Sequence, residues 1–174
     1  TAQQGPTAYV RFQRGSTISF GIKDGDTVRE LRGDLFANPT PTGKTYKLSE
    51  VKLLMPLDSK RVGKIIGLAG NSAAPGKGTP RNHQPLFSKF PEHLVGDGSE
   101  VPLFPETVGG MIYEAELVVV IGKKARHVSV ADAPKYIFGV AIGHDLQNLG
   151  WWMGGGNKDT QPEMFLAKNQ DASV

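Results

Sequence analysis

Short segments of alternating apolar and polar residues open the chain. Residues 8–12, 17–22 and 26–31 alternate in this way and are separated by the glycine-containing segments RGS and KDGD. This pattern predicts three short antiparallel strands joined by tight turns. Residues 36–47 contain two prolines and a glycine, so we predict a loop or linker there. Together these segments predict a small N-terminal domain over residues 1–55.

The rest of the chain has the pattern of strands interrupted by loops. Residues 64–71 are an apolar segment that ends in a glycine-rich turn, and residues 112–122 contain one of the most apolar runs of the chain. Ser129 is the predicted N-cap of a brief helix, with Asp132 three residues later. The alternating residues 138–145 predict a strand that ends at Asp145.

Composition narrows the class of protein. The 174 residues are 39% hydrophobic and 21% charged and include 22 glycines and 12 prolines, which favours many turns and short strands. The net charge of +3 is spread over 20 basic and 17 acidic residues without a basic cluster, so we expect no nucleic-acid partner. The absence of cysteine excludes disulfides, thiolate metal sites and a cysteine nucleophile.

The longest apolar runs are far shorter than the roughly 20 residues that a membrane-spanning helix needs. The N-terminus also has no signal-peptide pattern. We therefore expect no membrane partner and a cytoplasmic location. The chain begins with Thr1, so secretion or export to the periplasm after N-terminal processing is the alternative.

Two glutamates, Glu114 and Glu116, stand at the start of the second apolar run. On a strand they project from one face about 7 Å apart, where two carboxylates repel by roughly 2 kcal/mol at an effective dielectric constant of 20. Either this end of the strand is exposed and only residues 117–122 are buried, or the glutamates bind a cation such as Mg²⁺, Ca²⁺ or Mn²⁺. Asp145 is the candidate third ligand, because it ends the next predicted strand and consecutive strands are often neighbours.

Longer stretches carry a resemblance to a known family. They are KIIGLAGN, PLFSKFPEHLVGDGSEVPLFP, YEAELVVVIGKKARHVSVADAPKYIFGVAIGHDLQ and FLAKNQDAS, within residues 60–174. This part of the chain resembles the fumarylacetoacetate hydrolase family. The resemblance implies an α+β but mostly β fold, in which residues 56–174 form the N-terminal part of a mixed β roll or barrel. A small β-rich domain precedes it.

The resemblance also implies a function. Family members are usually homodimers that bind Mg²⁺ or Mn²⁺ through three carboxylates, and the matching positions are Glu114, Glu116 and Asp145. They act on small 2-oxo acids and related dicarbonyls by C–C bond hydrolysis, decarboxylation, isomerisation or dehydration, in which the cation stabilises an enolate. Lys168, in FLAK, matches a lysine near bound substrate. We therefore expect a metal-dependent enzyme with a small 2-oxo acid as its substrate.

The sequence departs from the family pattern in the loop after the first apolar segment. Members with hydrolase or decarboxylase activity have a histidine and a glutamate there that position or activate water, and Pro75 and Gly78 stand at these positions. Neither residue can transfer a proton with its side chain. His83 is the candidate substitute base, with a structural histidine as the alternative. A non-catalytic protein that binds a metal and a 2-oxo acid is therefore the alternative to an enzyme.

Further departures lie after Asp145, where the family's Ser/Thr-Ala-Arg-Asp run is replaced by LQNLGWWMGGG. Trp151 and Trp152 in this segment either line the pocket or pack a loop. Strand alternation predicts that His144 points away from the metal. Family members continue well past the position of Val174, so we expect the sequence to be a fragment of a longer protein.

Overall fold

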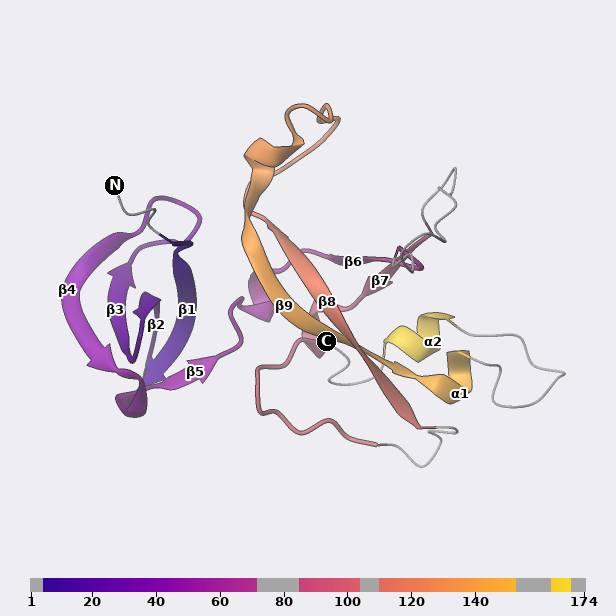
Figure 1. The fold of residues 1–174 in the computed structure, drawn as a ribbon, viewed down its shortest axis with the longest axis horizontal. Coiled ribbons are helices and arrows are strands. Elements are labelled where there is room, and N and C mark those ends of the chain that lie inside the picture. The colour runs from indigo at the N-terminus through magenta and orange to yellow at the C-terminus, as the bar shows by residue number, and fades with distance from the viewer. Residues whose placement is uncertain (1–4, 72–84, 104–109, 153–163, 170–174) are drawn as a thin grey trace, which may run out of the picture. The chain divides into compact units, whose positions relative to one another are not determined.

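The computed structural model describes residues 5–71, 85–103, 110–152 and 164–169. The chain divides into two compact units, one with residues 1–57 and 118–141 and the other with residues 58–117 and 142–174. The secondary structure is mostly β with short helices, as the sequence predicts (Figure 1). Among the described residues, no helix is long and apolar enough to cross a membrane.

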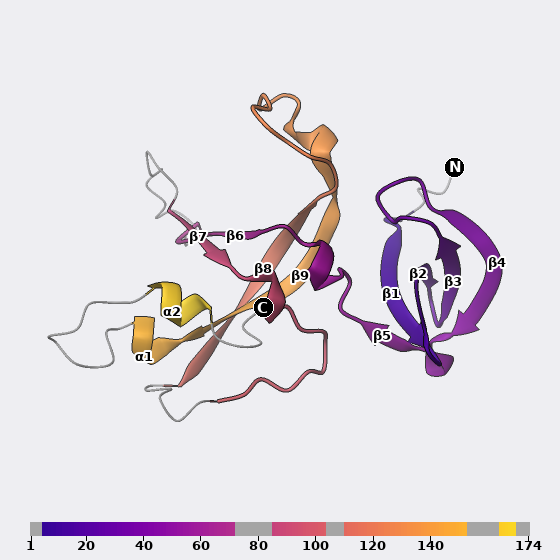
Figure 2. The ribbon, with the colours of Figure 1, turned by 180° about the vertical axis from the view of Figure 1, so that it is seen from behind.

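Five antiparallel strands form a sheet near the N-terminus, in the order β4-β3-β2-β1-β5. They are β1 (Ala8–Arg14), β2 (Thr17–Asp24), β3 (Thr27–Arg32), β4 (Thr40–Lys47) and β5 (Lys52–Leu54). The first three confirm the predicted meander, and both figures of the fold show β1 to β4 strongly curled (Figures 1 and 2). Its two tight turns begin with Gly15 and Gly25, whose φ angles of 58° and 53° are rarely adopted by residues with a side chain.

The prediction of a loop over residues 36–47 is wrong from Thr40 onwards, because Thr40–Lys47 form strand β4. This strand pairs with β3 and lies at the edge of the sheet, where a proline such as Pro41 is tolerated. The pairing register shifts between Arg29 and Leu31, and Leu31 is the partner of Pro41. Threonines and Tyr46 supply β propensity here that outweighs the proline and glycine signals.

The core of this sheet is small. Its buried apolar residues are Phe12, Val28, Leu31 and Leu35. Gly21 on β2 allows the strands to approach closely, because a Cβ at this position would overlap the Val28 side chain and would lie 2.8 Å from the Arg29 carbonyl oxygen. The packing therefore depends on the absence of a side chain at this point.

Two further strand pairs complete the β structure. In the first, β6 (Ile65–Leu68) runs antiparallel to β7 (Leu86–Lys89), with Gly67 opposite Phe87. In the second, β8 (Met111–Ile121) pairs with β9 (Ile137–Asn148) in a long ribbon. The short helices are η1 (Leu48–Glu50), η2 (Ser59–Arg61), η3 (Pro91–His93), η4 (Ala133–Tyr136), α1 (Leu149–Trp152) and α2 (Met164–Lys168).

The brief helix predicted after Ser129 is the 3-10 helix η4, but its N-cap is Asp132 and not Ser129 as predicted. The Ser129 hydroxyl accepts a hydrogen bond from the Asp132 backbone N–H at 3.2 Å and donates one to the Asp132 carboxylate at 2.7 Å. These bonds form the turn that precedes the helix. The strand that follows is longer than predicted, because β9 continues past Asp145 to Asn148.

The apolar part of β8 is exposed, so the expectation that residues 117–122 are buried is wrong. Leu117 is 70% exposed, Val119 46% and Ile121 55%. Within the described residues β8 pairs with β9 alone, in a two-stranded ribbon. A two-stranded ribbon cannot bury both of its faces, and this explains the exposure.

Candidate metal centre

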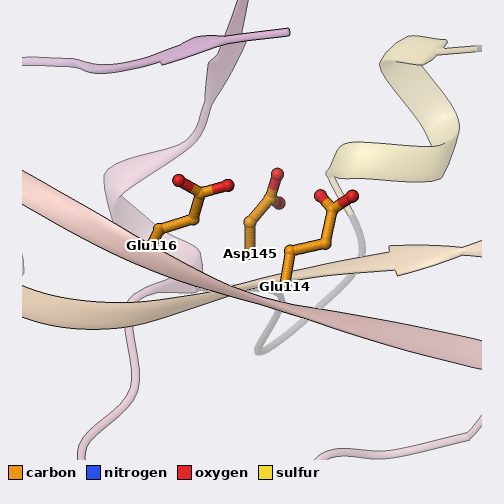
Figure 3. Close-up of side chains that lie close together, drawn as sticks. All are labelled: Glu114, Glu116 and Asp145. Carbon is orange, nitrogen blue, oxygen red and sulfur yellow. The ribbon is translucent and has the colours of Figure 1, made fainter. Parts of the chain in front are cut away.

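Three carboxylates converge on one side of the β8–β9 ribbon. Glu114 and Glu116 come from β8 and Asp145 comes from β9, and one oxygen of each lies within 4.8 Å of the other two (Figure 3). Asp145 is 8% exposed, and the two glutamates are more exposed. The structure thus brings together all three residues that the sequence analysis proposed as ligands. Their role as ligands stays a prediction.

The pairing of the two strands explains this convergence. The Leu149 N–H donates to the Gly110 carbonyl oxygen at 3.0 Å, next to the ribbon's end. Glu114 and Glu116 project from the same side of β8 because side chains alternate along a strand. The proximity of the Asp145 oxygen to the two glutamate oxygens places Asp145 on that same side of the ribbon.

Lys168, which the sequence analysis placed near bound substrate, contacts two of the three carboxylates. Its Nζ lies 2.8 Å from Glu114 Oε2 and 2.6 Å from Asp145 Oδ2, and the residue is 4% exposed. The ammonium also lies 4.8 Å from the ring centroid of Phe87 and 5.8 Å from that of Trp152. Lys168 is therefore held by carboxylates and by aromatic rings.

A second lysine, Lys89, was missed by the sequence analysis. Its Nζ lies 2.8 Å from Asp145 Oδ1 and donates to the Leu146 carbonyl oxygen at 2.8 Å. The residue is 3% exposed. Burial lowers the pKa of this ammonium, while the hydrogen bond and charge of Asp145 oppose the shift. The sequence feature that could have indicated its burial is the alternation of β7, which places Lys89 on the same face as the apolar Phe87.

The donor set fits a hard divalent cation. Carboxylate oxygens are the ligands that Mg²⁺ and Mn²⁺ prefer. Two oxygens bound to one Mg²⁺ at about 2.1 Å are at most about 4.2 Å apart, so the observed cluster needs only small side-chain movements to close on an ion. Among the described residues, two lysine ammoniums face three carboxylates, and Glu116 makes an ion pair with neither lysine.

The other residues singled out in the sequence have different positions. His83, Pro75 and Gly78 lie outside the described residues. Trp152 is half-buried with its ring near Lys168, so it adjoins the carboxylate cluster. His144 is exposed and its ring contacts that of Tyr113 at 6.0 Å between centroids, on the ribbon face that alternation places opposite the carboxylates.

A buried asparagine helps to shape this region. Asn148 at the end of β9 is 1% exposed, and its side-chain oxygen accepts hydrogen bonds from the backbone N–H groups of Gly150 and Trp151 at 3.0 and 3.3 Å. These bonds cap the first turn of α1 and so fix the direction in which the chain leaves the strand. Trp152 follows on the same helix, and its place near Lys168 depends on this cap.

The chain matches two known families over most of its length. Residues 61–174 match the family described as fumarylacetoacetate (FAA) hydrolase C-terminal, and residues 8–56 match the one described as Rv2993c-like, N-terminal. The chain is similar to Protein Rv2993c of Mycobacterium tuberculosis strain H37Rv, with 28% identity over 156 residues that cover 82% of this chain and 58% of that protein. Human mitochondrial oxaloacetate tautomerase FAHD2A is 33% identical over 106 residues, which cover 60% of this chain and 33% of that protein.

The fold is also similar to that of solved structures. A 5-carboxymethyl-2-hydroxymuconate delta-isomerase from Mycobacterium smegmatis superposes with a TM-score of 0.75 and 28% sequence identity. The match covers 94% of this chain and 62% of that protein. The chain thus spans less than two thirds of the length of these relatives.

Proposed function

The chain belongs to the fumarylacetoacetate hydrolase family, and we propose that it is a divalent-metal-dependent enzyme that acts on a small 2-oxo acid or related dicarbonyl. The observation that carries this proposal is the convergence of Glu114, Glu116 and Asp145 beside the buried ammonium of Lys168. This donor set favours Mg²⁺ or Mn²⁺ as the cofactor.

The surrounding residues have separate roles in the proposed chemistry. A divalent cation held by the three carboxylates would supply Lewis-acid stabilisation of negative charge on a substrate oxygen. Lys168 would donate hydrogen bonds to a substrate carboxylate or to an oxygen on which charge develops. Lys89 holds Asp145 in place through its ion pair. The rings of Phe87 and Trp152 flank the Lys168 ammonium and limit the access of water to it.

Among the reactions of the family, we propose isomerisation or tautomerisation for this chain. These reactions move a proton within the substrate and need no activated water, which suits a chain with Pro75 and Gly78 in place of the water-positioning histidine and glutamate. The similarity to proteins named a tautomerase and a delta-isomerase supports the same choice. His83 remains the candidate base.

The second candidate function is non-catalytic binding of a metal and a 2-oxo acid. The replacement of the histidine and glutamate by Pro75 and Gly78 favours it, because neither of these residues has a side chain that can accept a proton. The carboxylate cluster would serve this function equally well. Binding without turnover is the outcome that identifies it.

Calorimetry and proton exchange together test the proposal. Mg²⁺ and Mn²⁺ are titrated into the wild type, into Glu116→Gln, and into Glu100→Gln, an exposed glutamate outside the cluster that serves as control. NMR then follows exchange of the C3 protons of oxaloacetate with D₂O. We expect metal binding and metal-dependent exchange in the wild type and the control, and loss of both in Glu116→Gln. Binding without exchange would support the non-catalytic function, and no binding would refute both.

We also propose that the protein is a homodimer, as the family resemblance implies. Size-exclusion chromatography with light scattering tests this assembly. A dimer has twice the 18.7 kDa mass of one chain, and a mass of one chain at micromolar concentration would contradict the proposal.

A further inference from the structure

The ammonium of Lys168 bridges Glu114 on β8 and Asp145 on β9, at 2.8 and 2.6 Å. Both carboxylates belong to the proposed metal centre. We propose that Lys168 occupies the cation position in the metal-free protein and is displaced when a divalent cation binds. The inference rests on the proposed function, because it concerns how this chain's own residues receive that metal.

A divalent cation can bind these carboxylates only if one of the two lysine ammoniums moves away from them. Each oxygen of Asp145 is within 2.8 Å of an ammonium, Oδ1 of Lys89 and Oδ2 of Lys168. A cation shared by Glu114 and Asp145 must contact an oxygen of each, and Lys168 is the ammonium that already lies against both. A second cation at the same oxygens would meet strong repulsion from this ammonium.

Lys89 is less suited to move. Its Nζ forms an ion pair with Asp145 Oδ1 and also donates a hydrogen bond to the Leu146 carbonyl oxygen, each at 2.8 Å. Moving its ammonium would leave the part-buried Leu146 carbonyl oxygen without this donor, and such a loss is unfavourable. Lys89 therefore stays with Asp145 and orients it in both states.

Two aromatic rings offer the displaced ammonium a second position. Phe87 and Trp152 lie within 6 Å of Lys168 Nζ, close enough for cation–π attraction. Lys168 is the last residue of the five-residue helix α2, and its four-carbon side chain can rotate without moving the backbone. The ammonium can therefore leave the carboxylates and keep favourable contacts.

The need to displace the Lys168 ammonium lowers the affinity of the carboxylates for a divalent cation. Because the incoming cation must first displace Lys168, the same carboxylates should bind metal more tightly once this charge is removed. Lys168→Met keeps the length and the apolar stem of the side chain and removes the ammonium. We expect it to bind Mn²⁺ roughly tenfold more tightly than the wild type, a change typical of coupled binding.

Calorimetric titration of Mn²⁺ into the wild type, Lys168→Met and Lys135→Met tests this expectation. Lys135 also pairs with an aspartate, at 2.6 Å, but its partner Asp132 lies outside the cluster. Lys135→Met thus makes the same change in net charge and should leave the affinity unchanged. An affinity of Lys168→Met equal to or weaker than that of the wild type would overturn the inference.

Lysine acylation in the wild type tests displacement directly and needs no variant. Acetic anhydride labels accessible amines, and mass spectrometry reports the labelling of each lysine with and without saturating Mn²⁺. We expect labelling of Lys168 to rise several-fold with Mn²⁺ while that of Lys89 and Lys135 stays constant. Tighter binding by Lys168→Met with no rise in Lys168 labelling would also overturn the inference. The Lys168 ammonium would then weaken metal binding by repulsion alone, without being displaced.

The two proposals fail in different ways. If neither the wild type nor Lys168→Met binds Mn²⁺, the metal-dependent function fails and the inference falls with it. If the wild type binds Mn²⁺ and Lys168→Met binds it no more tightly, the metal centre stands and only the displacement of Lys168 is refuted.

Discussion

The ammonium of Lys89 and the carboxylate of Asp145 form a buried ion pair, with Nζ 2.8 Å from Oδ1. They come from strand β7 and from the part of β9 that belongs to the same unit, so the pair connects two strands that are not paired with each other in a sheet. It also fixes the orientation of the most buried carboxylate in the proposed metal centre. Stability and metal binding therefore depend on the same residue.

Asp145→Asn should be strongly destabilising. The substitution removes the carboxylate from two buried lysines, and breaking a buried ion pair at one partner typically costs about 3 kcal/mol or more. Urea unfolding measures the change in free energy. Glu116→Gln is the matched control, because within the described residues Glu116 pairs with neither lysine, and its cost should stay below about 1 kcal/mol. Equal costs for the two variants would contradict this role of the ion pair.

The carboxyl of Asp132 should titrate below its ordinary pKa of 3.8, because the Lys135 ammonium and then the Ser129 hydroxyl donate hydrogen bonds to it. A depressed pKa in the folded state means that the ionised carboxyl stabilises the turn above the unfolded pKa, and that this contribution is lost as pH falls through the folded value. NMR titration of the Asp132 carboxyl carbon measures the midpoint. Lys135→Met should raise it towards 3.8, and an unchanged midpoint would exclude Lys135 as the main cause.

Apolar runs and alternating segments along the chain predicted the strands that carry the site. The meander β1 to β3 and the glutamate-bearing strand β8 follow directly from local pattern, and so does the common face of Glu114 and Glu116. The order of strands along the chain was sufficient to suggest Asp145 as the third carboxylate. Each of these inferences uses residues that are close in sequence or elements that follow one another.

The features that the sequence did not predict depend on contacts between distant segments. Strand β4 was missed because its local proline and glycine signals favour a loop, whereas its pairing with β3 adds to the β propensity of its threonines and Tyr46. Lys89 was missed because a lysine within a short apolar strand has no local partner, and its partners Asp145 and Leu146 lie on β9. No periodicity within one segment can reveal such a pair.

Trp152→Leu should loosen Lys168 in the metal-free protein. The Trp152 ring lies 5.8 Å from the ammonium, and a cation–π contact of this kind contributes about 0.5–1 kcal/mol. Acetylation of Lys168 without metal should therefore become about two- to fivefold faster. Trp151→Leu removes the neighbouring ring and serves as control. If both variants label Lys168 at the same rate, the effect comes from loss of packing around α1 and not from the Trp152 ring.

Gly67→Ala should disturb Lys168 without changing any charge. Gly67 lies opposite Phe87 in the β6–β7 pair, and a Cβ there would lie 2.5 and 2.6 Å from Cε1 and Cε2 of the Phe87 ring. Such contacts are too short, so the ring must move away from β6 or the strands must separate, at a cost of about 1–3 kcal/mol. Because Phe87 also flanks the Lys168 ammonium, acetylation of Lys168 should become faster as well.

Gly63→Ala is the control, since a Cβ at Gly63 meets nothing within 4 Å. A destabilised Gly67→Ala with unchanged Lys168 labelling would show that the Phe87 ring does not help to hold the lysine.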